Sequence, residues 1–244
     1  MEGSLPPRTN HLLARFPPDV YEALRPRLQL CQLPAGKVIF EDRAECGHLY
    51  FPVSGIIARV LVNVDDEATE LSLCGSEGVV GISLLLGDGA IASALVLIDA
   101  CAYRCPRDVL AGAMGVAAFR NVILRYAHFV VGEIAQCALC NRHHELDGQF
   151  ARWLLVCADR VGQAELRVTH AMVSRMLAVR REGVTEAAGR LHAAGAISVS
   201  RGVIRVLDRG RLLQRACSCY LALESESRRL LYETSAEPSR VFQT

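Results

Sequence analysis

Two cysteines and a histidine near the middle of the chain have the spacing of metal ligands. Cys140 follows Cys137 by three residues and His144 follows Cys140 by four, so a helix would carry all three on one face. Thiolate sulfur and imidazole nitrogen at such a spacing suit a zinc ion. The favoured alternative is that the two cysteines are small side chains packed in a helical seam, beside exposed histidines.

The chain has ten cysteines in all. In a reducing compartment such residues are expected to be free thiols, metal ligands or sensors, and not disulfides. Cys101 with Cys105 and Cys217 with Cys219 are further closely spaced pairs. These spacings do not select a cofactor, so a metal, haem and redox-active thiols all stay open.

Arginines are concentrated in one part of the sequence. Nine arginines stand against three acidic residues between Ser174 and Arg215, although the formal net charge of the whole chain is only +1. A local positive excess suits a surface that faces phosphates. A solvated arginine-rich face is the alternative, because the chain uses arginine in general and has Lys37 as its only lysine.

Length and composition predict a folded protein of two ordinary domains or one large one: 244 residues, 51% of them hydrophobic and 22% charged. No stretch reaches the roughly 18 unbroken apolar residues of a membrane span, and no secretory signal is evident, so a cytoplasmic location is expected. A Ser-His-Asp signature, a phosphate loop and a His-Glu-x-x-His motif are all absent from the sequence, which argues against an enzyme.

Residues 32–107 show the pattern of β-strands. Short apolar runs such as Val38–Phe40 and Ile56–Val62 alternate with turn-forming residues. Many short strands at regular spacing predict a closed or sandwiched antiparallel sheet, here a β-roll or barrel. A helical segment over residues 10–28 is expected to precede it.

A long helix is expected next, because no proline occurs from residue 108 to residue 166 and apolar residues recur at intervals of four and three. The recurring residues are Ile123, Ala127, Val130, Ile134 and Cys137. This seam predicts a parallel two-stranded coiled coil with a second copy of the chain. Packing against the roll of the same chain is the alternative. Residues 146–161 predict a further helix.

The last third of the chain predicts a winged helix-turn-helix. Thr169 is placed as an N-cap, and apolar residues follow it at helical spacing. A second helix is expected over residues 180–193, ended by Gly195, and a tight hairpin over residues 197–206 follows. Two short helices and a hairpin could also form a protein-interaction domain, but arginines at the start of the second helix favour DNA.

Taken in this order, the chain resembles the Crp/Fnr superfamily of bacterial regulators. The resemblance is carried by Leu33–Gly36, Leu49–Gly55, Ala151–Leu155, Val168–Leu191, Gly195–Ile197 and Arg201–Ile204. It implies an α+β chain with a cyclic-nucleotide-binding-like β-roll (1–114), a dimerisation helix (115–145), a winged helix-turn-helix domain (146–223) and a tail (224–244).

The resemblance also implies which residues meet DNA. Arg181 and Glu182 match the Arg-Glu pair that the family presents to base edges, where arginine bonds guanine and glutamate accepts from cytosine. Glu186 stands where the family has a further arginine, which implies a different target sequence. Arg180 completes the base-reading set and is also a candidate for phosphate contacts. The other expected phosphate contacts are Thr169, Ser174 and Arg201.

The expected effector pocket lies in the roll around Gly78, Gly81 and Ser93. Cyclic-nucleotide members of the family have a Gly-Glu-Leu cassette and an Arg-Ser pair there. In this chain the glutamate is missing and Ala92 replaces the arginine, so a buried cyclic phosphate would lack its counter-charge. Cyclic AMP is therefore not expected as the effector.

The resulting prediction is a homodimeric, sequence-specific transcription regulator that binds a two-fold symmetric DNA site. RNA polymerase would be a further partner if the protein activates transcription. The alternative is an effector-binding scaffold, or a redox- or metal-sensing module, that acts through a protein partner.

Overall fold

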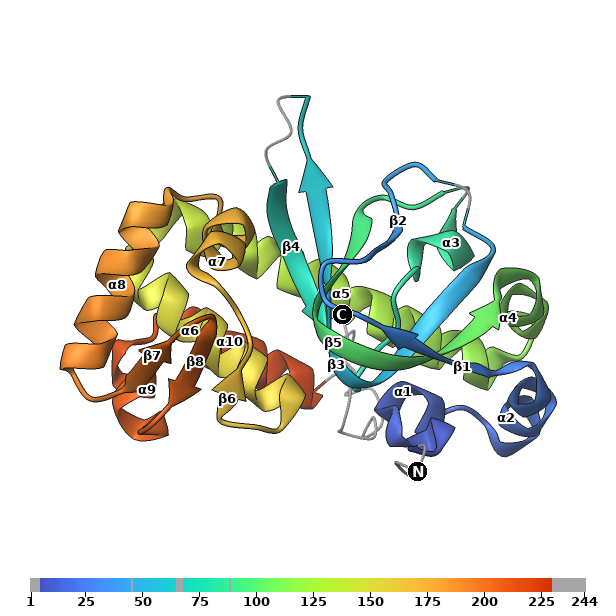
Figure 1. Cartoon of the computed structure of the whole chain (residues 1–244). Helices are drawn as coiled ribbons and strands as arrows, with labels where there is room; N and C mark the ends of the chain where they lie inside the picture. Colours follow the sequence, from blue (N-terminus) through green and yellow to red (C-terminus); the bar gives the residue numbers. More distant parts are fainter. Residues whose placement is uncertain (1–4, 45, 65–67, 88, 230–244) are drawn as a thin grey trace, which may run out of the picture.

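The computed structural model describes residues 5–44, 46–64, 68–87 and 89–229 (Figure 1). The expected tail, residues 224–244, lies outside the described residues from residue 230 onward. The helices and 3-10 turns are η1 (Pro7–Thr9), α1 (His11–Ala14), α2 (Pro18–Leu24), η2 (Arg25–Arg27), α3 (Ser83–Leu86), α4 (Arg107–Ala113), α5 (Ala117–His143), α6 (Leu146–Val161), α7 (His170–Leu177), α8 (Arg181–Ala193), α9 (Arg209–Arg215) and α10 (Cys219–Ser227). The strands are β1 (Gln29–Leu33), β2 (Val38–Phe40), β3 (His48–Val62), β4 (Ala68–Cys74), β5 (Ser93–Pro106), β6 (Glu165–Leu166), β7 (Ile197–Ser200) and β8 (Val203–Val206). This order confirms the predicted α+β architecture.

The N-terminal roll is built on two long strands. β3 pairs with β4 and β5, and β5 also pairs with β1 and β2, always antiparallel. The sequence predicted shorter strands because Ser54 and Gly55 interrupt the apolar pattern. The structure instead has one bent strand: Gly55 has φ of 74°, and a Cβ there would lie 2.2 Å from the Asp99 carbonyl oxygen. Only glycine fits this bulge, so β3 continues through it.

The predicted helical lead-in forms α1 and α2, which pack on the roll. Buried Asn10 fixes the first of them. Its side-chain amide donates to the carbonyl oxygens of Pro52 and Gly78, both at 2.8 Å, and its Oδ1 accepts the backbone N–H of Leu13 at 3.0 Å. One side chain therefore caps α1 and joins it to two segments of the roll.

The long helix α5 packs against the roll of its own chain, which corrects the predicted dimer seam. Ile123 and Val130 are buried in the roll's hydrophobic core, with Ala127 and Ile134 packed against it. Cys137 is also buried within the chain. The helical spacing of these apolar residues therefore reflects packing against the roll of the same chain, which was the alternative to a coiled coil.

By length and composition α5 could also cross a membrane, with a mean hydropathy of 1.3 in its most apolar stretch. In this fold its apolar residues complete the roll's core, and buried Glu133 forms an ion pair at its centre. These contacts account for the apolar residues on one side of the helix.

The last third confirms the predicted winged helix-turn-helix. α6 spans the residues that the sequence predicted, and α7 and α8 follow with a tight turn between them. β7 and β8 form the wing, and the short β6 adds a third strand beside β8 that the sequence did not predict. α6 is the centre of this unit, because Phe150, Trp153 and Leu154 are all fully buried.

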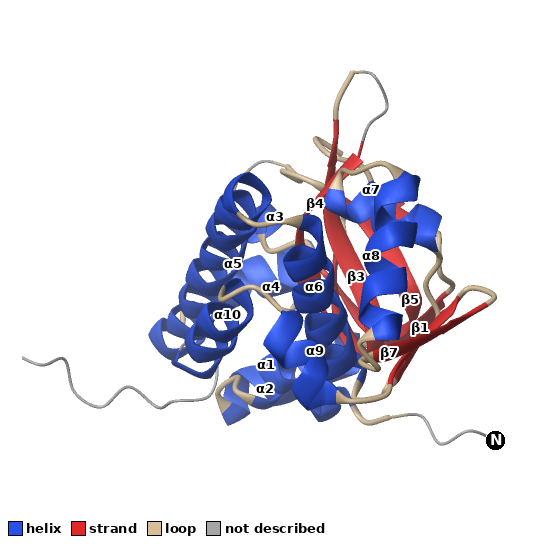
Figure 2. Ribbon diagram, turned by 90° about the vertical axis from the view of Figure 1, so that its left-hand side faces the viewer, coloured by secondary structure: helices blue, strands red, loops and turns tan. Residues whose placement is uncertain are grey.

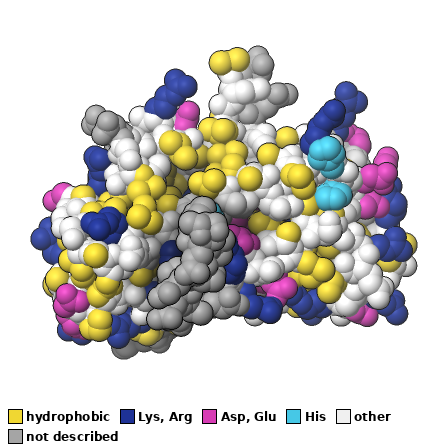
Figure 3. Space-filling model, turned by 180° about the vertical axis from the view of Figure 1, so that it is seen from behind, with side chains coloured by type: hydrophobic (Ala, Val, Ile, Leu, Met, Phe, Trp, Pro, Cys, Tyr) yellow, Lys and Arg dark blue, Asp and Glu magenta, His cyan; other side chains and the backbone are white. Residues whose placement is uncertain are grey.

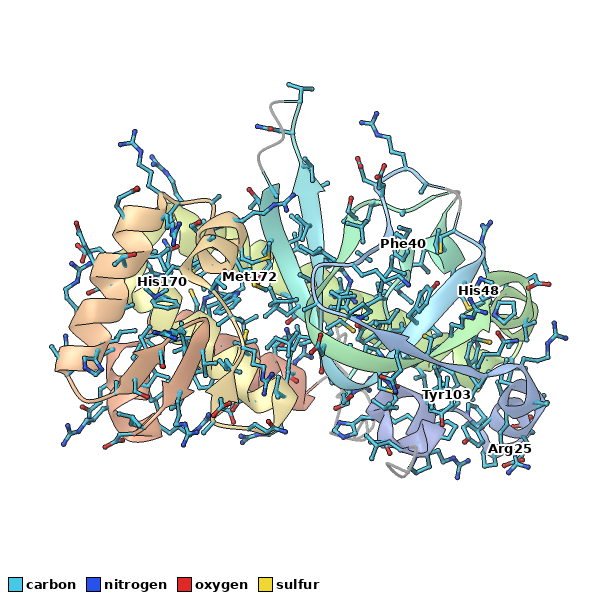
Figure 4. All side chains as sticks on the ribbon, viewed as in Figure 1. Arg25, Phe40, His48, Tyr103, His170 and Met172 are labelled. Atoms are coloured by element: carbon cyan, nitrogen blue, oxygen red, sulfur yellow. The ribbon has the colours of Figure 1, made fainter. Side chains whose placement is uncertain are left out.

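The roll and the winged helix-turn-helix share one core. Val60 and Leu73 of the roll join α6, α7 and α8 in a single hydrophobic cluster. Met172 of α7 packs against this cluster and lies toward β4 (Figure 4). The indole N–H of Trp153 donates to Glu70 Oε2 of β4 at 2.8 Å. The two units are thus docked through both apolar contacts and buried polar contacts.

The buried Glu70 predicts a pH-dependent stability. Burial raises its pKa from 4.5 to about 7, so the folded chain holds a proton at pH values where the unfolded chain has lost it. Stability is therefore expected to fall as the pH rises from about 4.5 to 7. Glu70→Gln keeps an acceptor for Trp153 and should remove that loss, worth at most about 3 kcal/mol.

Thermal unfolding of both proteins between pH 5 and pH 8 checks this prediction. The melting temperature of Glu70→Gln should exceed that of the native chain at pH 8 and approach it at pH 5. Glu165→Gln, which alters an exposed ion pair with Arg205, is the control and should follow the native profile. Parallel profiles for the native chain and Glu70→Gln would contradict the assignment.

Candidate nucleic-acid interface

The helix-turn-helix is held in place by local hydrogen bonds. Thr169 caps α7, accepting the backbone N–H of Met172 at 3.1 Å. Ala178, with φ of 53°, makes the turn into α8. His170 of α7 lies against α8, where its Nδ1 is 3.0 Å from Thr185 Oγ1 (Figure 4). These contacts fix the angle between the two helices before any DNA is bound.

The first turn of α8 presents the predicted base-reading residues. Arg180 is the N-cap, Arg181 and Glu182 begin the helix, and all three are exposed. None of them takes part in an ion pair within the described part of the chain. Their side chains are therefore free to meet the edge of a DNA base.

Glu186, the fourth predicted base reader, has a partner in its own helix. Its Oε2 lies 3.7 Å from Arg190 Nη1, and Arg190 also holds Asp147 at 2.6 and 2.7 Å. The Glu186 side chain is 71% exposed, so this ion pair is weak and the carboxylate can still reach outward.

The other arginines of this domain divide into two groups. Four of them, all away from the start of α8, are neutralised by a carboxylate: Arg190 by Asp147, Arg205 by Glu165, Arg209 by Asp159 and Arg211 by Asp208. By contrast, six arginines of this domain are exposed and belong to no ion pair among the described residues: Arg167, Arg175, Arg180, Arg181, Arg201 and Arg215. Four of these six lie on α7, at the start of α8 and on the wing.

The three predicted phosphate contacts differ in what they can donate. Arg201 lies exposed at the wing turn, and its guanidinium belongs to no ion pair among the described residues. Thr169 accepts a bond as N-cap and keeps its own hydroxyl proton for a phosphate oxygen. The Ser174 hydroxyl donates to the Ala171 carbonyl at 2.9 Å, so that side chain would have to rotate before it could serve.

The roll offers little room for a ligand at the predicted effector pocket. Gly81 and Ser93 line a cavity of only about 30 Å³. Gly78 is not part of it, because it lies against the Tyr126 ring, where a Cβ would be 2.1 Å from the hydroxyl oxygen. Its inclusion in the pocket was therefore wrong. Small-molecule sites usually measure about 300–1,000 Å³, so this cavity is far below nucleotide size.

The cation that lines this cavity is already engaged by the protein. Arg59 is buried and donates to Val79 O at 2.7 Å, Ser72 Oγ at 3.0 Å and the Tyr126 hydroxyl at 2.7 Å. Ala92 also lines the cavity at the place of the missing arginine. A phosphate in this cavity would meet no free positive charge among the described residues that line it.

A larger cavity, of about 400 Å³, lies between the two units. It is lined by residues of the roll, α5, α6 and α10, among them Phe129 and Tyr220. Its charged wall is a buried cluster in which Arg160 of α6 contacts Glu133 of α5 and, at 3.1 Å, Glu77 of the roll. The arginine thereby connects three elements.

The predicted metal candidates are only partly brought together. Cys140 and His144 lie in one cluster with Cys217 and Cys219. Cys137 is not a member of that cluster. Cys137 lies one turn before Cys140 on α5, and its sulfur is 3.8 Å from Arg152 Nη1 of α6. The sequence did not predict this combination, because the second pair of cysteines is more than 70 residues away.

The fold and this interface define a class of protein: a DNA-binding transcriptional regulator that joins a cyclic-nucleotide-binding-like roll to a helix-turn-helix domain. The cyclic nucleotide-binding domain family matches residues 30–115, and the Crp-like helix-turn-helix domain family matches residues 148–215. The two matches together cover more than half of the sequence. The chain belongs to the Crp/Fnr family of transcriptional regulators.

Solved structures agree with this assignment at the level of the fold. FixK2 from Bradyrhizobium japonicum is 16% identical, with a TM-score of 0.69, over 78% of this chain and 98% of that one. A Crp/Fnr family transcriptional regulator from Thermus thermophilus is 21% identical, with a TM-score of 0.64, over 77% of this chain and 98% of that one. No curated protein matches the chain in sequence.

Proposed function

We propose that this regulator acts as a homodimer and reads a two-fold symmetric DNA site with the first turn of α8. The observation that supports this most directly is the separation of the arginines into a paired group and an uncompensated group. Arg180 and Arg181 at the start of α8, and Arg201 on the wing, belong to no ion pair in the part of the chain that the structure describes. When a winged helix-turn-helix binds DNA in this way, the start of the recognition helix contacts base edges and the wing contacts the phosphate backbone.

The dimer contact is assigned to the outward face of α5. Leu124, Val131 and Leu139 are 47%, 65% and 50% exposed, at intervals of seven and eight residues. Hydrophobic side chains gather over this side of the molecule (Figure 3). A near-heptad stripe on a long helix suits a second copy of the same helix. Two recognition helices would then meet half-sites about 34 Å apart.

Charge substitution on this face is expected to produce monomers. Leu124→Glu combined with Val131→Glu would place two like charges opposite each other in a symmetric helix pair, and the dimer should be lost. Sedimentation equilibrium measures the mass directly. Leu86→Glu, at a half-exposed leucine on α3, is the control and should remain dimeric. A double variant with the dimer mass would contradict this face.

The effector is not expected to be cyclic AMP. The roll cavity is too small, and the arginine that lines it is already bonded to the protein. Isothermal titration with cyclic AMP should give no heat of binding. Micromolar affinity for it would overturn this part of the proposal.

The decisive test is selection of bound sequences from a random duplex pool at near-physiological salt. Recovery of an inverted repeat supports a dimeric, sequence-specific regulator, because operator symmetry mirrors protein symmetry. A single ungapped half-site would support DNA reading but contradict the dimer. Binding without any sequence enrichment, in both reduced and oxidised protein, would contradict base reading and favour the alternative of a module that acts through a protein partner.

A further inference from the structure

Four potential metal ligands meet where the last helices return to α5. Cys140 Sγ lies 3.5 Å from Cys217 Sγ, and Cys219 Sγ lies 3.4 Å from His144 Nδ1. The four ligand atoms are all within 4.8 Å of one another. Three sulfurs and one nitrogen around a zinc ion would be about 3.6–3.8 Å apart, given zinc distances of about 2.3 and 2.0–2.1 Å and tetrahedral angles. The cluster is therefore already close to the size of such a site.

The fold positions these ligands from both sides. Cys140 lies in the last turn of α5 and His144 is its C-cap, so both belong to the end of one helix. Cys217 and Cys219 lie just after α9, at the start of α10, which runs alongside α5 (Figure 2). The backbone N–H of Cys217 donates to the Gly148 carbonyl at 3.2 Å. A Cβ at Gly148 would lie 3.3 Å from the Cys217 Cβ, so a glycine lets the cysteine segment approach α6.

Neighbouring amides hold the ligands in the manner of a metal site's outer shell. Gln136 Nε2 donates to Cys219 Sγ at 2.9 Å, and an N–H···S bond of this kind favours the thiolate form. Gln149 Nε2 donates to the His144 carbonyl oxygen at 2.6 Å and fixes the backbone of the histidine. Both glutamines are at least partly buried, so these contacts persist without help from solvent.

A buried cation lies beside the cluster, next to Cys137. Arg152 of α6 is only 3% exposed, and it belongs to none of the ion pairs within the described residues. Its Nε has no hydrogen-bond partner, and its Nη1 approaches a sulfur, that of Cys137. The groups that act electrostatically on this guanidinium are the thiols of Cys137, Cys140 and Cys217 and the carboxyl of Glu70, whose pKa is itself raised by burial. A buried arginine is costly unless negative charge is nearby. Three thiolates, a neutral histidine and a divalent metal carry a net charge of −1, which this guanidinium would balance.

We propose that Cys140, His144, Cys217 and Cys219 form a closed tetrahedral site for a zinc(II) ion. Three thiolates and an imidazole are a ligand set of structural zinc sites, and four protein ligands leave no open position for catalysis. Each thiol gives up its proton to solvent as the metal binds, and no oxidant or reductant is needed.

The site would fasten the link between α5 and α6 to the start of α10. Residues 144 and 145 separate α5 from α6, and the ligands lie directly on this link and on the segment that leaves α9. A bound metal would tie α5 to the far end of the helix-turn-helix domain and to α10. Whether the chain binds zinc does not depend on the proposed DNA function. Any effect of zinc on DNA affinity would depend on that function.

The test begins with the reduced full-length chain and cobalt(II), a spectroscopic probe of zinc sites. One equivalent of cobalt should bind with the visible absorption of a tetrahedral thiolate complex, and zinc should displace it. Alkylation mapped by mass spectrometry should show zinc protecting Cys217, the partly exposed cysteine of the cluster, while half-buried Cys31 reacts equally with and without metal. Absence of stoichiometric binding, or equal alkylation of Cys217 with and without zinc, would overturn the proposal.

Variants then identify the ligands. Cys217→Ser and His144→Ala should each weaken binding by at least about tenfold, whereas Cys137→Ala should retain the metal. Equal losses in Cys137→Ala and Cys217→Ser would overturn the assigned ligand set. If a ligand variant does not fold, the protection pattern of the native chain decides alone. A chain that binds zinc but enriches no DNA sequence would refute the proposed function and leave the metal site standing.

Discussion

Replacing Arg160 with methionine should lower the free energy of unfolding by about 3–5 kcal/mol, the usual cost of removing one partner from a buried ion pair. Arg160 lies between Glu133 and Glu77, and the side chains of all three are no more than 11% exposed. Burial alone would lower the pKa of the arginine, but the two carboxylates raise it well above its usual value. Without the guanidinium, two carboxylates would face each other in a buried site.

Urea unfolding at pH 7 measures this loss. Arg205→Met is the matched control: its ion pair with Glu165 is exposed and should be worth less than about 1 kcal/mol. Adding Glu133→Gln to Arg160→Met should recover part of the stability, because one of the stranded charges is removed. A cost for Arg160→Met no larger than that for Arg205→Met would mean that the cluster does not hold the two units together.

The winged helix-turn-helix was predicted well because its signals are local. An N-cap at Thr169, an apolar period of 3.6 and a glycine at position 195 each act within a few residues of the chain. The same locality made α6 predictable to its ends. The element that the sequence did not predict is β6, a strand of two residues that is defined only by its pairing with β8.

The face of α5 could not be assigned from its sequence because the helix is apolar on two sides. Ile123 and Val130 form the more regular seam, and they serve the roll. Leu124 and Val131, each one residue further on, are left exposed. A one-dimensional pattern shows that a helix has apolar faces but not which partner each of them meets. That information comes from the strands packed against it.

The metal ligands also show that a local sequence pattern does not identify which residues meet in the fold. Cys140 and His144 have a suitable local spacing, and so does Cys137, but only three-dimensional packing separates them. α10 returns to the end of α5 and brings Cys217 and Cys219 with it. Proximity between ligands more than 70 residues apart is a property of the fold. The sequence shows each pair of ligands, but it does not show that the two pairs lie next to each other.

The largest functional effect is expected from Arg181→Ala. A bidentate arginine–guanine contact is worth about 1–3 kcal/mol of base discrimination, so affinity for the selected site should fall about 5–150-fold per half-site. Affinity for random duplex should change much less. Arg181 is exposed at the first position of α8 and pairs with no carboxylate among the described residues, so its removal should leave the fold intact.

Arg201→Ala provides the contrast that distinguishes base reading from charge. Arg201 lies on the wing, where a phosphate contact adds affinity without reading sequence. Its removal should weaken specific and random duplex by the same factor and reduce the slope of log affinity against log salt by about one for each half-site. Arg209→Gln, in α9 and already paired with Asp159, is the control and should bind both duplexes as the native chain does. Fluorescence anisotropy at several salt concentrations gives all of these values. If Arg181→Ala and Arg201→Ala reduce binding to both duplexes equally, the start of α8 contributes charge and does not read bases.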